Sequence, residues 1–439
     1  MDAVSSQFLV PSPDDFDSQR ADRSLGMRRA ARYYNELVAP GIGGAWKVRH
    51  LSWAVAGLYL RQQLGDRHSA VALAHGVEAL GSKQEWSLLP AEQQTARTGL
   101  RGTRAFNRTP DAWSFKELSQ RRCYVQVTHR QQVTRALPSD TGLGLAEGSS
   151  RFNGMVLSTP GRDLAEALLN QQSVGRGRPS LLQMLKKWVL EDFEMTPGIE
   201  RLAQGLGPSS PSEDERKLVL GRLLSQVSPG SIVGPRDPKR RIRLIEFLDT
   251  QVGDNEGWSD VEGLLGWLES QPGGTAHADD LRTARAFEDM RTAGVAVLNA
   301  IGALLLERGS LIQVAACAKH PSVQPALARF RVQAARYRHH AAHGNNGRPD
   351  AREFVAQTEA APDDEALVAA LVRRDGRILE LSGDAVYRGP LFHVFQQRAD
   401  GTAGRAIPDL EEAEESAPTG RPARLFSFIA LWRDCHAQA

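Results

Sequence analysis

Cysteine is scarce in this chain: its 439 residues include only three, Cys123, Cys317 and Cys435, which are far apart in the sequence. None of them belongs to a Cys-x-x-Cys pair, which argues against a disulfide framework and against the usual structural zinc site. His320 and His436 each lie close to a cysteine, but two ligands do not hold a zinc ion without a third and a fourth. We therefore predict neither a metal site nor a cofactor.

Long apolar runs and an excess of one charge are also missing. The longest apolar run, 293–306, is shorter than the roughly 20 residues that a membrane-spanning helix needs. The first residues have neither the basic nor the apolar part of a signal peptide. The 54 basic and 52 acidic residues give a net charge of +2, so any surface that attracts nucleic acid must be local. We expect a soluble cytoplasmic protein with no membrane segment.

The sequence has no recognisable motif of a common enzyme class. It contains no nucleophile elbow, no protein-kinase signature, no His-Glu-x-x-His pair and no paired-carboxylate nuclease motif. The glycine-rich segment 142–150 (GLGLAEGSS) lacks the Lys-Ser/Thr of a phosphate-binding P-loop. We predict that this segment is a loop.

Apolar residues recur at helical spacing along most of the chain, which predicts a mainly α, multi-helical fold. A chain of this length exceeds one ordinary core, so we expect two or three domains, with small winged-helix-like β elements. The predicted parts are an extended N-terminal arm (1–20), an N-terminal helical domain (21–112), a winged-helix-like module (113–173), a helical connecting domain (174–272), a C-terminal helical bundle with a short β-hairpin (273–405), and an acidic linker with a terminal helix (406–439).

The winged-helix-like module contains one clear local signal. A short strand ending at Leu157 precedes Ser158 and Thr159 as N-cap candidates, Pro160 in the first turn, and an amphipathic helix. The earlier segment 115–138 is either one long helix or contains a strand, because its YVQVT stretch is rich in β-branched residues.

The regular apolar spacing over 277–345 predicts a long antiparallel pair of helices, stopped by Gly309 and Gly344. Two short alternating stretches around Gly383 predict a hairpin or winged element. The acidic run 409–422 is expected to be a linker. The apolar terminal helix after it needs a partner, which favours burial against another protein, although it could equally fill a core of this chain.

One segment suggests chemistry. In RYRHHAAHGNN (336–346), Arg338 and His343 lie five residues apart, roughly 140° around a helix, so they converge on one phosphate only if a second helix closes the site. His343 could then act as base or acid towards a ribose 2′-hydroxyl while Arg338 holds the phosphate. The other interpretation is an ordinary helix C-terminus, where arginine and histidine offset the helix dipole.

The same pattern resembles the signature of the HEPN superfamily of helical-bundle ribonucleases and related non-catalytic modules. That signature is an arginine, often followed by a polar residue, with a histidine a few residues later near the end of a late helix. Arg338, His339 and His343 match it, within the region 277–346. The resemblance implies a metal-independent ribonuclease whose motif is used across a homodimer.

A second resemblance covers more of the chain. The segment LGMRRAARYYNELVAPGIGGAWKVRHLSWAVAGLYLR (25–61) is similar to the N-terminal pattern of an uncharacterised bacterial defence-island family, in which a helix ends at a Leu-x-Pro-Gly turn before a helix rich in arginine and aromatic residues. LSTPGRDLAEALL (157–169) resembles the mid-chain element of that family. This resemblance implies a component of an anti-phage system that associates with other subunits.

Two basic clusters are candidate nucleic-acid contacts, with a solvated helix face as the alternative for each. The first spans 20–34 and continues to residue 49; its tyrosines and Trp46 could stack on bases while its cations contact phosphates. The second spans 234–243. The candidate residues are Arg28, Arg29, Arg32, Lys47, Arg49, Lys239, Arg240 and Arg241.

These observations predict a non-enzymatic subunit of a prokaryotic anti-phage defence complex. Its expected partners are other defence-system subunits and, through the basic clusters, DNA or RNA. One alternative is an HEPN-like metal-independent ribonuclease that uses Arg338 and His343. A second alternative is a DNA-binding regulatory protein, whose affinity would fall steeply with salt.

Overall fold

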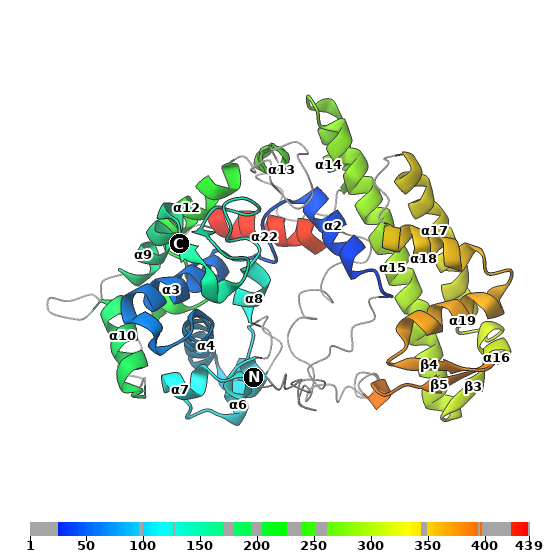
Figure 1. The fold of residues 1–439 in the computed structure, drawn as a ribbon, viewed down its shortest axis with the longest axis horizontal. Helices are drawn as coiled ribbons and strands as arrows, with labels where there is room; N and C mark the ends of the chain where they lie inside the picture. The colour runs from blue at the N-terminus through cyan, green and yellow to red at the C-terminus, as the bar shows by residue number, and fades with distance from the viewer. Residues whose placement is uncertain are drawn as a thin grey trace, which may run out of the picture. The chain divides into compact units, whose positions relative to one another are not determined.

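A computed structural model of the protein describes residues 25–95, 100–125, 128–170, 180–194, 204–225, 239–250, 261–343, 349–393, 396 and 423–437. The predicted N-terminal arm and acidic linker lie outside these residues. The fold is mainly helical with a few small antiparallel strands (Figure 1). The fold class predicted from the apolar spacing is thus confirmed.

The chain divides into two compact units. Unit 1 comprises 1–30, 289–339 and 347–407, and unit 2 comprises 31–288, 340–346 and 408–439. The domain boundaries predicted near residues 112, 173 and 272 therefore fall inside unit 2. The predicted N-terminal helical domain from residue 31, the winged-helix-like module and the helical connecting domain therefore belong to one unit.

The core of unit 2 is built around α3 (Val48–Leu64) and α4 (Ala70–Leu88), which are buried along most of their length. Gly57 makes their close approach possible, because a Cβ at this position would lie only 2.4 Å from the Cβ of Ala74. α3 also packs against α9 (Thr159–Leu169) and α12 (Glu213–Leu224). Further helices among the described residues of unit 2 include α2 (Arg28–Val38, which begins in unit 1), α5 (Ala91–Thr95), α6 (Thr103–Arg108), α7 (Phe115–Leu118), α8 (His129–Val133), α10 (Leu181–Glu191), α13 (Arg240–Thr250) and α14 (Val261–Ser270).

The strand-to-helix signal at 153–170 is confirmed. β2 (Val156–Leu157) pairs antiparallel with β1 (Ala146–Glu147), and the Ser158 hydroxyl accepts a hydrogen bond from the N–H of Gly161 to cap α9. The segment 115–138 is neither one long helix nor a described strand. It breaks into α7 and α8, because Ser114 and Thr128 each start a new helix with a capping box.

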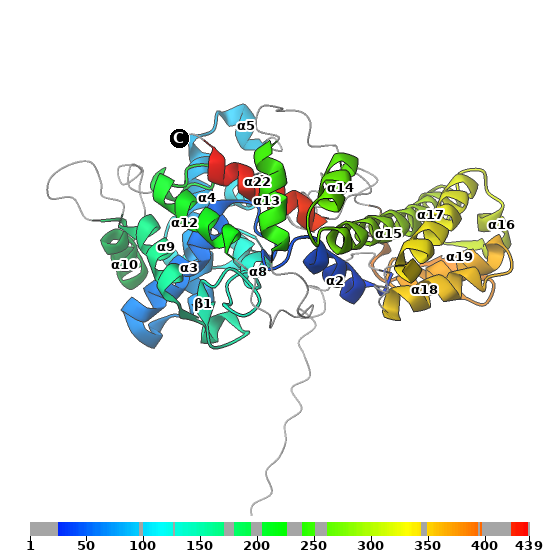
Figure 2. The ribbon, with the colours of Figure 1, turned by 90° about the horizontal axis from the view of Figure 1, so that it is seen from above.

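The predicted antiparallel helical pair is formed in unit 1 by the part of α15 (Thr275–Arg308) from Asp289 onward and the part of α17 (Gln324–His343) up to His339 (Figure 2). Asp289 on α15 forms an ion pair with Arg336 on α17, and one and a half turns further along α15, Gly294 faces Phe330. Gly309 ends α15 with φ +120°, as predicted. An 18-residue window of α15 is apolar enough to cross a membrane, but half of that window is buried inside the protein, as expected for the core helix of a soluble protein.

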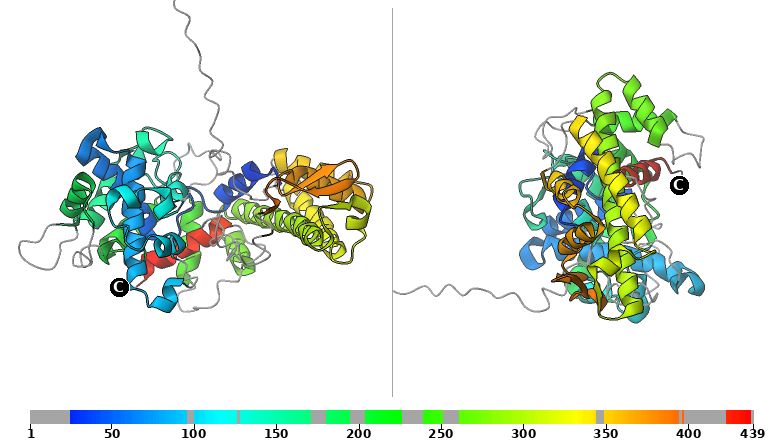
Figure 3. Two further views of the ribbon diagram at one scale, coloured as in Figure 1. Left: turned by 90° about the horizontal axis from the view of Figure 1, so that it is seen from below. Right: turned by 90° about the vertical axis from the view of Figure 1, so that its right-hand side faces the viewer.

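A small sheet completes unit 1. β4 (Leu379–Ser382) and β5 (Ala385–Arg388) form the predicted hairpin, which turns at Gly383 with φ +61° (orange in Figure 3). β3 (Leu311–Gln313), which the sequence did not predict, pairs with β5 and gives the order β3-β5-β4. α16 (Val314–Ala318), α18 (Pro349–Glu359) and α19 (Asp364–Asp375) are the remaining helices of this unit.

The terminal helix, α22 (Ala423–His436), packs into the chain's own core. Phe428 and Leu431 are fully buried, and α22 contacts α3 and α12. The Asp434 carboxylate accepts a hydrogen bond of 2.7 Å from the N–H of Val48, at the start of α3. Of the two predicted alternatives, a partner protein and a core of this chain, the apolar face of this helix takes the second and fills unit 2.

Candidate nucleic-acid interface

α2 presents the strongest candidate surface among the predicted basic residues. Its apolar positions recur at helical spacing. Among them, Ala30, Tyr34 and Leu37 are buried, and so is Met27 just before the helix. The opposite face is exposed and carries the arginines Arg28, Arg29 and Arg32. The amphipathic pattern thus fixes which side of α2 meets solvent, and it places these three guanidinium groups on that side.

Arg135, which lies just after α8, extends this surface and was missed in the sequence. Its side chain is exposed, yet its pKa is lowered by partial burial and further by the charges of Arg32 and Arg424. Like charges raise each other's energy when they lie close together. A single arginine in the stretch QVTRALPSD gives no signal that it would come to lie beside α2.

Glu36 forms an ion pair with Arg424 at 2.7 Å, and both side chains are largely buried. Its other oxygen accepts a hydrogen bond from the N–H of Gly41. From a greater distance, the charge of Glu36 also acts to raise the pKa of Arg135 and so opposes part of the lowering. Within the described residues, Arg32 and Arg135 form no ion pair. Arg32 and Arg135 are both exposed and both belong to unit 2, and we call these two residues the arginine face; Arg28 and Arg29 are exposed at the start of α2, in the part that belongs to unit 1.

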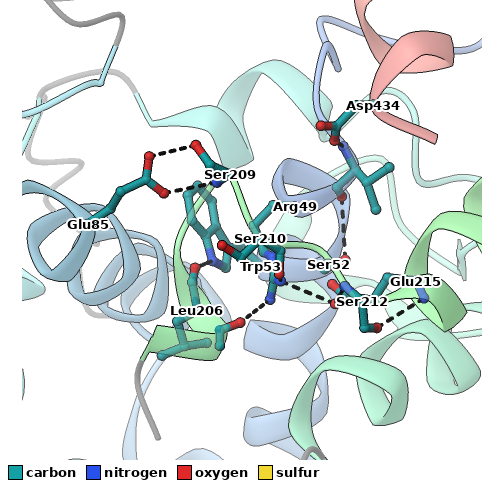
Figure 4. Close-up of polar contacts among 12 residues, drawn as sticks. Arg49, Ser52, Trp53, Glu85, Leu206, Ser209, Ser210, Ser212, Glu215 and Asp434 are labelled. Atoms are coloured by element: carbon teal, nitrogen blue, oxygen red, sulfur yellow. Dashed lines mark hydrogen bonds and ion pairs between the residues drawn. The ribbon is translucent and has the colours of Figure 1, made fainter. Parts of the chain in front are cut away.

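Arg49 does not belong to this surface, although the sequence suggested it. Its side chain is fully buried, and the guanidinium donates to the carbonyls of Gly205 (2.6 Å) and Ser210 and lies 3.3 Å from the Glu215 carboxylate (Figure 4). Burial lowers its pKa, against the attraction of Glu215. Trp53 makes a parallel contact, from its indole N–H to the carbonyl of Leu206 at 3.0 Å. Arg49 therefore fastens the segment 204–212 to α3 rather than contacting a ligand.

Arg240 and Arg241 are corrected in the same way. Arg240 is buried, donates to the carbonyl of Leu37 and forms an ion pair with Asp280. Arg241 is fully buried and donates to the carbonyl of Ser225 at 2.8 Å. Burial lowers the pKa of Arg241 to about 10, and Arg222 contributes to this. Both side chains therefore bind groups in the interior of unit 2 rather than a ligand at its surface.

The two predicted lysines are more accessible. Lys239 is exposed at the start of α13. Lys47 is half-buried, with its ammonium 5.7 Å from the centre of the Trp46 ring and 3.5 Å from the Ser209 hydroxyl. The structure does not place either lysine in contact with the arginine face.

The predicted Arg338 and His343 pair is only partly described. Arg338 lies on α17 with 63% of its side chain exposed, and its guanidinium is 2.9 Å from the Glu359 carboxylate on α18. His339 is exposed on the same helix. The side chain of His343 lies outside the described residues. The structure thus joins Arg338 to Glu359 and leaves its relation to the His343 imidazole as a prediction.

A cluster of buried histidines in unit 2 was missed in the sequence. His50 on α3 and His129 on α8 stack face to face, with ring centroids 3.6 Å apart and planes 13° from parallel. We call this pair the imidazole stack. Trp46 lies edge-on to His50 at 4.8 Å. Within the described residues, neither ring nitrogen of His50 has a hydrogen-bond partner. Burial lowers the pKa of both histidines well below the usual value, so both are neutral at pH 7.

Glu78 of α4 lies beside this stack and is fully buried. Its carboxylate accepts hydrogen bonds from the N–H groups of His129 (2.7 Å) and Arg130 (3.1 Å) and from the Tyr124 hydroxyl (3.0 Å). Burial raises its pKa, and these hydrogen bonds oppose the rise. Glu78 therefore caps the start of α8 and fixes it against α4.

No cluster of three or more histidine, cysteine, aspartate or glutamate side chains suited to a metal ion occurs in the described parts of the chain. The three cysteines are buried free thiols. Comparison with models of protein families, with curated proteins and with solved structures finds no match to this chain. The arginine face is therefore interpreted from its own geometry and charge.

Proposed function

We propose that this protein is a non-enzymatic, nucleic-acid-binding subunit of a cytoplasmic bacterial anti-phage defence complex, and that the arginine face contacts the phosphate backbone of DNA or RNA. The proposal rests on two exposed arginines from separate elements of unit 2, Arg32 and Arg135, which form no ion pair among the described residues and are close enough that, besides partial burial, the charge of Arg32 lowers the pKa of Arg135. The placement in a defence complex rests on the resemblance of segments 25–61 and 157–169.

Backbone phosphates fit this surface better than a small anion does. Arg32 lies on α2 and Arg135 just beyond α8, and both side chains are exposed rather than gathered in a buried pocket. Guanidinium groups donate forked hydrogen bonds to phosphate oxygens, and two of them on an exposed face match a polyanion. Contacts of this kind give affinity without sequence specificity.

Protein partners are expected on unit 1. Exposed large apolar side chains occur on both units, but on unit 1 Leu311, which is 45% accessible, has an exposed neighbour on the adjacent strand. Tyr387 is the cross-strand neighbour of Leu311 and is also exposed. Such apolar side chains are candidates for a contact with another subunit.

A binding assay tests the nucleic-acid proposal directly. Fluorescence anisotropy with labelled mixed-sequence duplex DNA, single-stranded DNA and RNA, measured over a series of salt concentrations, should show affinity that falls steeply with salt. The double variant Arg32→Ala/Arg135→Ala should bind at least about 10-fold more weakly, because a hydrogen bond to a charged group contributes about 1.5–3 kcal/mol. The slope of its log affinity against log salt concentration should be shallower, by about the amount expected for the loss of two phosphate contacts.

Arg104→Ala is the matched control. Arg104 is an exposed arginine on α6, without an ion pair among the described residues. Its removal lowers the net charge by one without touching the arginine face. Equal losses from Arg104→Ala and from either single variant of the face would show that only net charge matters and would overturn the assignment. Salt-insensitive or absent binding would do the same.

The HEPN-like ribonuclease is the second candidate. The observation that favours it is the exposed guanidinium of Arg338, which Glu359 holds in place on the last turns of α17. If this function is correct, the purified protein cleaves RNA in the presence of EDTA, and His343→Ala abolishes cleavage while leaving the far-UV circular dichroism unchanged. Cleavage that the variant retains would exclude His343 as the base.

A further inference from the structure

The imidazole stack joins the two elements that frame the arginine face. His50 lies in the first turn of α3, which follows α2 after the loop 39–47. His129 is the first residue of α8, and Arg135 lies two residues beyond its end. The same loop is tied to α8 by a hydrogen bond of 3.0 Å from the N–H of Gly44 to the carbonyl of Gln132. The position of Arg135 relative to Arg32 therefore depends on the docking of α8.

The surroundings of the stack tolerate two neutral imidazoles and oppose a charged one. Both rings are almost fully buried, and each faces the positive charges of Arg101 and Lys47. Trp46 and Trp53, from the loop and from α3, cover the rings without offering a charge. A proton on either ring would place a buried cation 3.6 Å from the second imidazole, and burying an unpaired charge is costly.

The other ionisable groups around α8 do not compensate such a charge. From α4, Glu78 directs its carboxylate to the backbone at the start of α8, and His75 packs edge-on against Tyr124. Arg130, on α8 itself, adds a further positive charge. Because burial raises the pKa of Glu78, its own protonation in acid favours the folded state and works against the histidines.

We propose that the imidazole stack is an acid-sensitive latch: it holds α8 and Arg135 in place while both rings are neutral, and mild acid releases α8 and thereby weakens nucleic-acid binding at the arginine face. The regulatory part of this inference rests on the proposed function, whereas the latch itself does not.

The direction follows from proton linkage. A histidine that is released from the stack titrates near pH 6.5, whereas the pKa of each buried ring is well below that value. The closed state is therefore fully stable above pH 6.5 and loses stability as the pH falls below it. Between pH 7.5 and 5 the equilibrium constant for opening rises about 30-fold for each histidine, and about 10³-fold for the pair, as long as both rings stay neutral when closed.

Hydrogen exchange of the full-length protein measures the latch independently of nucleic acid. The N–H groups of Thr134 and Ala136 are hydrogen-bonded within and just after α8. After correction for intrinsic exchange, their protection should fall by up to about 10³-fold between pH 7.5 and 5. In His50→Phe/His129→Phe, whose aromatic pair cannot take up a proton, it should change by less than about 10-fold.

The single variants keep the test valid if the double variant does not fold. In His50→Phe, the fall in protection of α8 between pH 7.5 and 5 should be about half of the wild-type fall on a logarithmic scale. His68→Gln, at a half-buried position outside the stack, should behave like the wild type. An equal loss of protection in wild type and double variant would overturn the latch. So would stable protection at pH 5 in the wild type.

Nucleic-acid affinity at the two pH values tests the regulatory part. Protonation of the exposed histidines alone would strengthen binding to a polyanion, so weaker binding at pH 5 in the wild type, absent in the double variant, is the expected and opposite result. Affinity that rises equally in both proteins would overturn the regulation. No binding at either pH, together with normal loss of α8 protection, would overturn the proposed function and the regulation while leaving the latch intact.

Discussion

Two arginines of unit 1 and two of unit 2 have opposite roles. On α17 in unit 1, Arg331 and Arg338 are largely exposed and lie against carboxylates of neighbouring helices. In unit 2, Arg49 and Arg241 are fully buried, and their guanidinium groups donate to backbone carbonyls of segments distant in the sequence. The two arginines of unit 1 are thus surface charges and the two of unit 2 are structural connectors, although other arginines of unit 2, such as Arg32 and Arg135, are exposed.

An arginine-rich stretch therefore does not by itself identify a binding surface. An exposed ion pair contributes about 0–1 kcal/mol, because water and salt screen it. A buried cation is tolerated only when its donors are satisfied, and removing it then leaves its partners without a counter-charge. Substitution of a buried arginine should therefore lower the free energy of unfolding several-fold more than substitution of an exposed one. The sequence ranges of unit 1 contain no tryptophan, so indole fluorescence does not report the unfolding of unit 1 and follows that of unit 2.

The largest effect is expected from Arg49→Met. The change removes the donors to Gly205 and Ser210 and leaves the Glu215 carboxylate buried without its cation. We expect a loss of about 3–5 kcal/mol, the range for breaking a buried ion pair, in urea unfolding followed by tryptophan fluorescence. The double variant Arg49→Met/Glu215→Gln should recover part of this loss. A loss below about 1 kcal/mol in the single variant would contradict the structural role.

The sequence predicted those parts of the fold that depend on short-range signals. The cap at Ser158, the stop at Gly309 and the turn at Gly383 are all specified by a few neighbouring residues, and all three are confirmed. β3 was missed because three residues carry too little pattern, and its partner β5 is more than 70 residues away in the sequence. The break of 115–138 into two helices was missed although Ser114 and Thr128 supply ordinary capping signals.

The candidate site was less predictable than the fold. The sequence identified Arg28, Arg29 and Arg32 from their amphipathic helix, but it gave the same weight to Arg49, whose acceptor Gly205 lies 156 residues away. No local pattern distinguishes an arginine that meets distant carbonyls from one that meets solvent. The contribution of Arg135 and the imidazole stack likewise arises only when separate elements pack together.

The second-largest effect is an acid dependence confined to unit 2. His75 and His277 are buried in this unit, and burial lowers their pKa values to about 4 and about 3. Each is neutral when folded and titrates near 6.5 when unfolded, so stability is unaffected above pH 6.5 and falls below it. The loss is about 2 kcal/mol for each histidine at pH 5. His277→Gln can still donate to the carbonyl of Val38. In this variant, the loss of unfolding free energy at pH 5, measured by tryptophan fluorescence, should be smaller by the contribution of one histidine, about 2 kcal/mol. An unchanged pH dependence would contradict the burial of a neutral ring.

A smaller effect is expected from Ser158→Ala. The Ser158 hydroxyl accepts from the N–H of Gly161 and donates to the carbonyl of Gly144 at 2.6 Å, so it links α9 to the loop before β1. Loss of an N-cap costs about 1 kcal/mol, and the unpaired carbonyl adds to that figure. Ser158→Thr should retain most of the stability, since threonine also caps helices. If alanine and threonine at this position are equally stable, the cap contributes nothing.

The smallest effect is expected from Arg331→Ala in unit 1, which tests the exposed half of the comparison. Arg331 donates two hydrogen bonds, of 3.2 and 2.9 Å, to one oxygen of Asp364 in the first turn of α19, and hydrogen bonds from Gln324 and Arg331 lower the pKa of that carboxyl. We expect a loss of about 0.5 kcal/mol or less at low salt, read by hydrogen exchange in α17 and α19, and almost none at 1 M salt. The tryptophan transition should not change. Because the pKa of Asp364 is lowered, the contribution is present above about pH 4 and is lost as the carboxyl becomes protonated below it. A loss as large as that of Arg49→Met would erase the distinction between the exposed and the buried arginines.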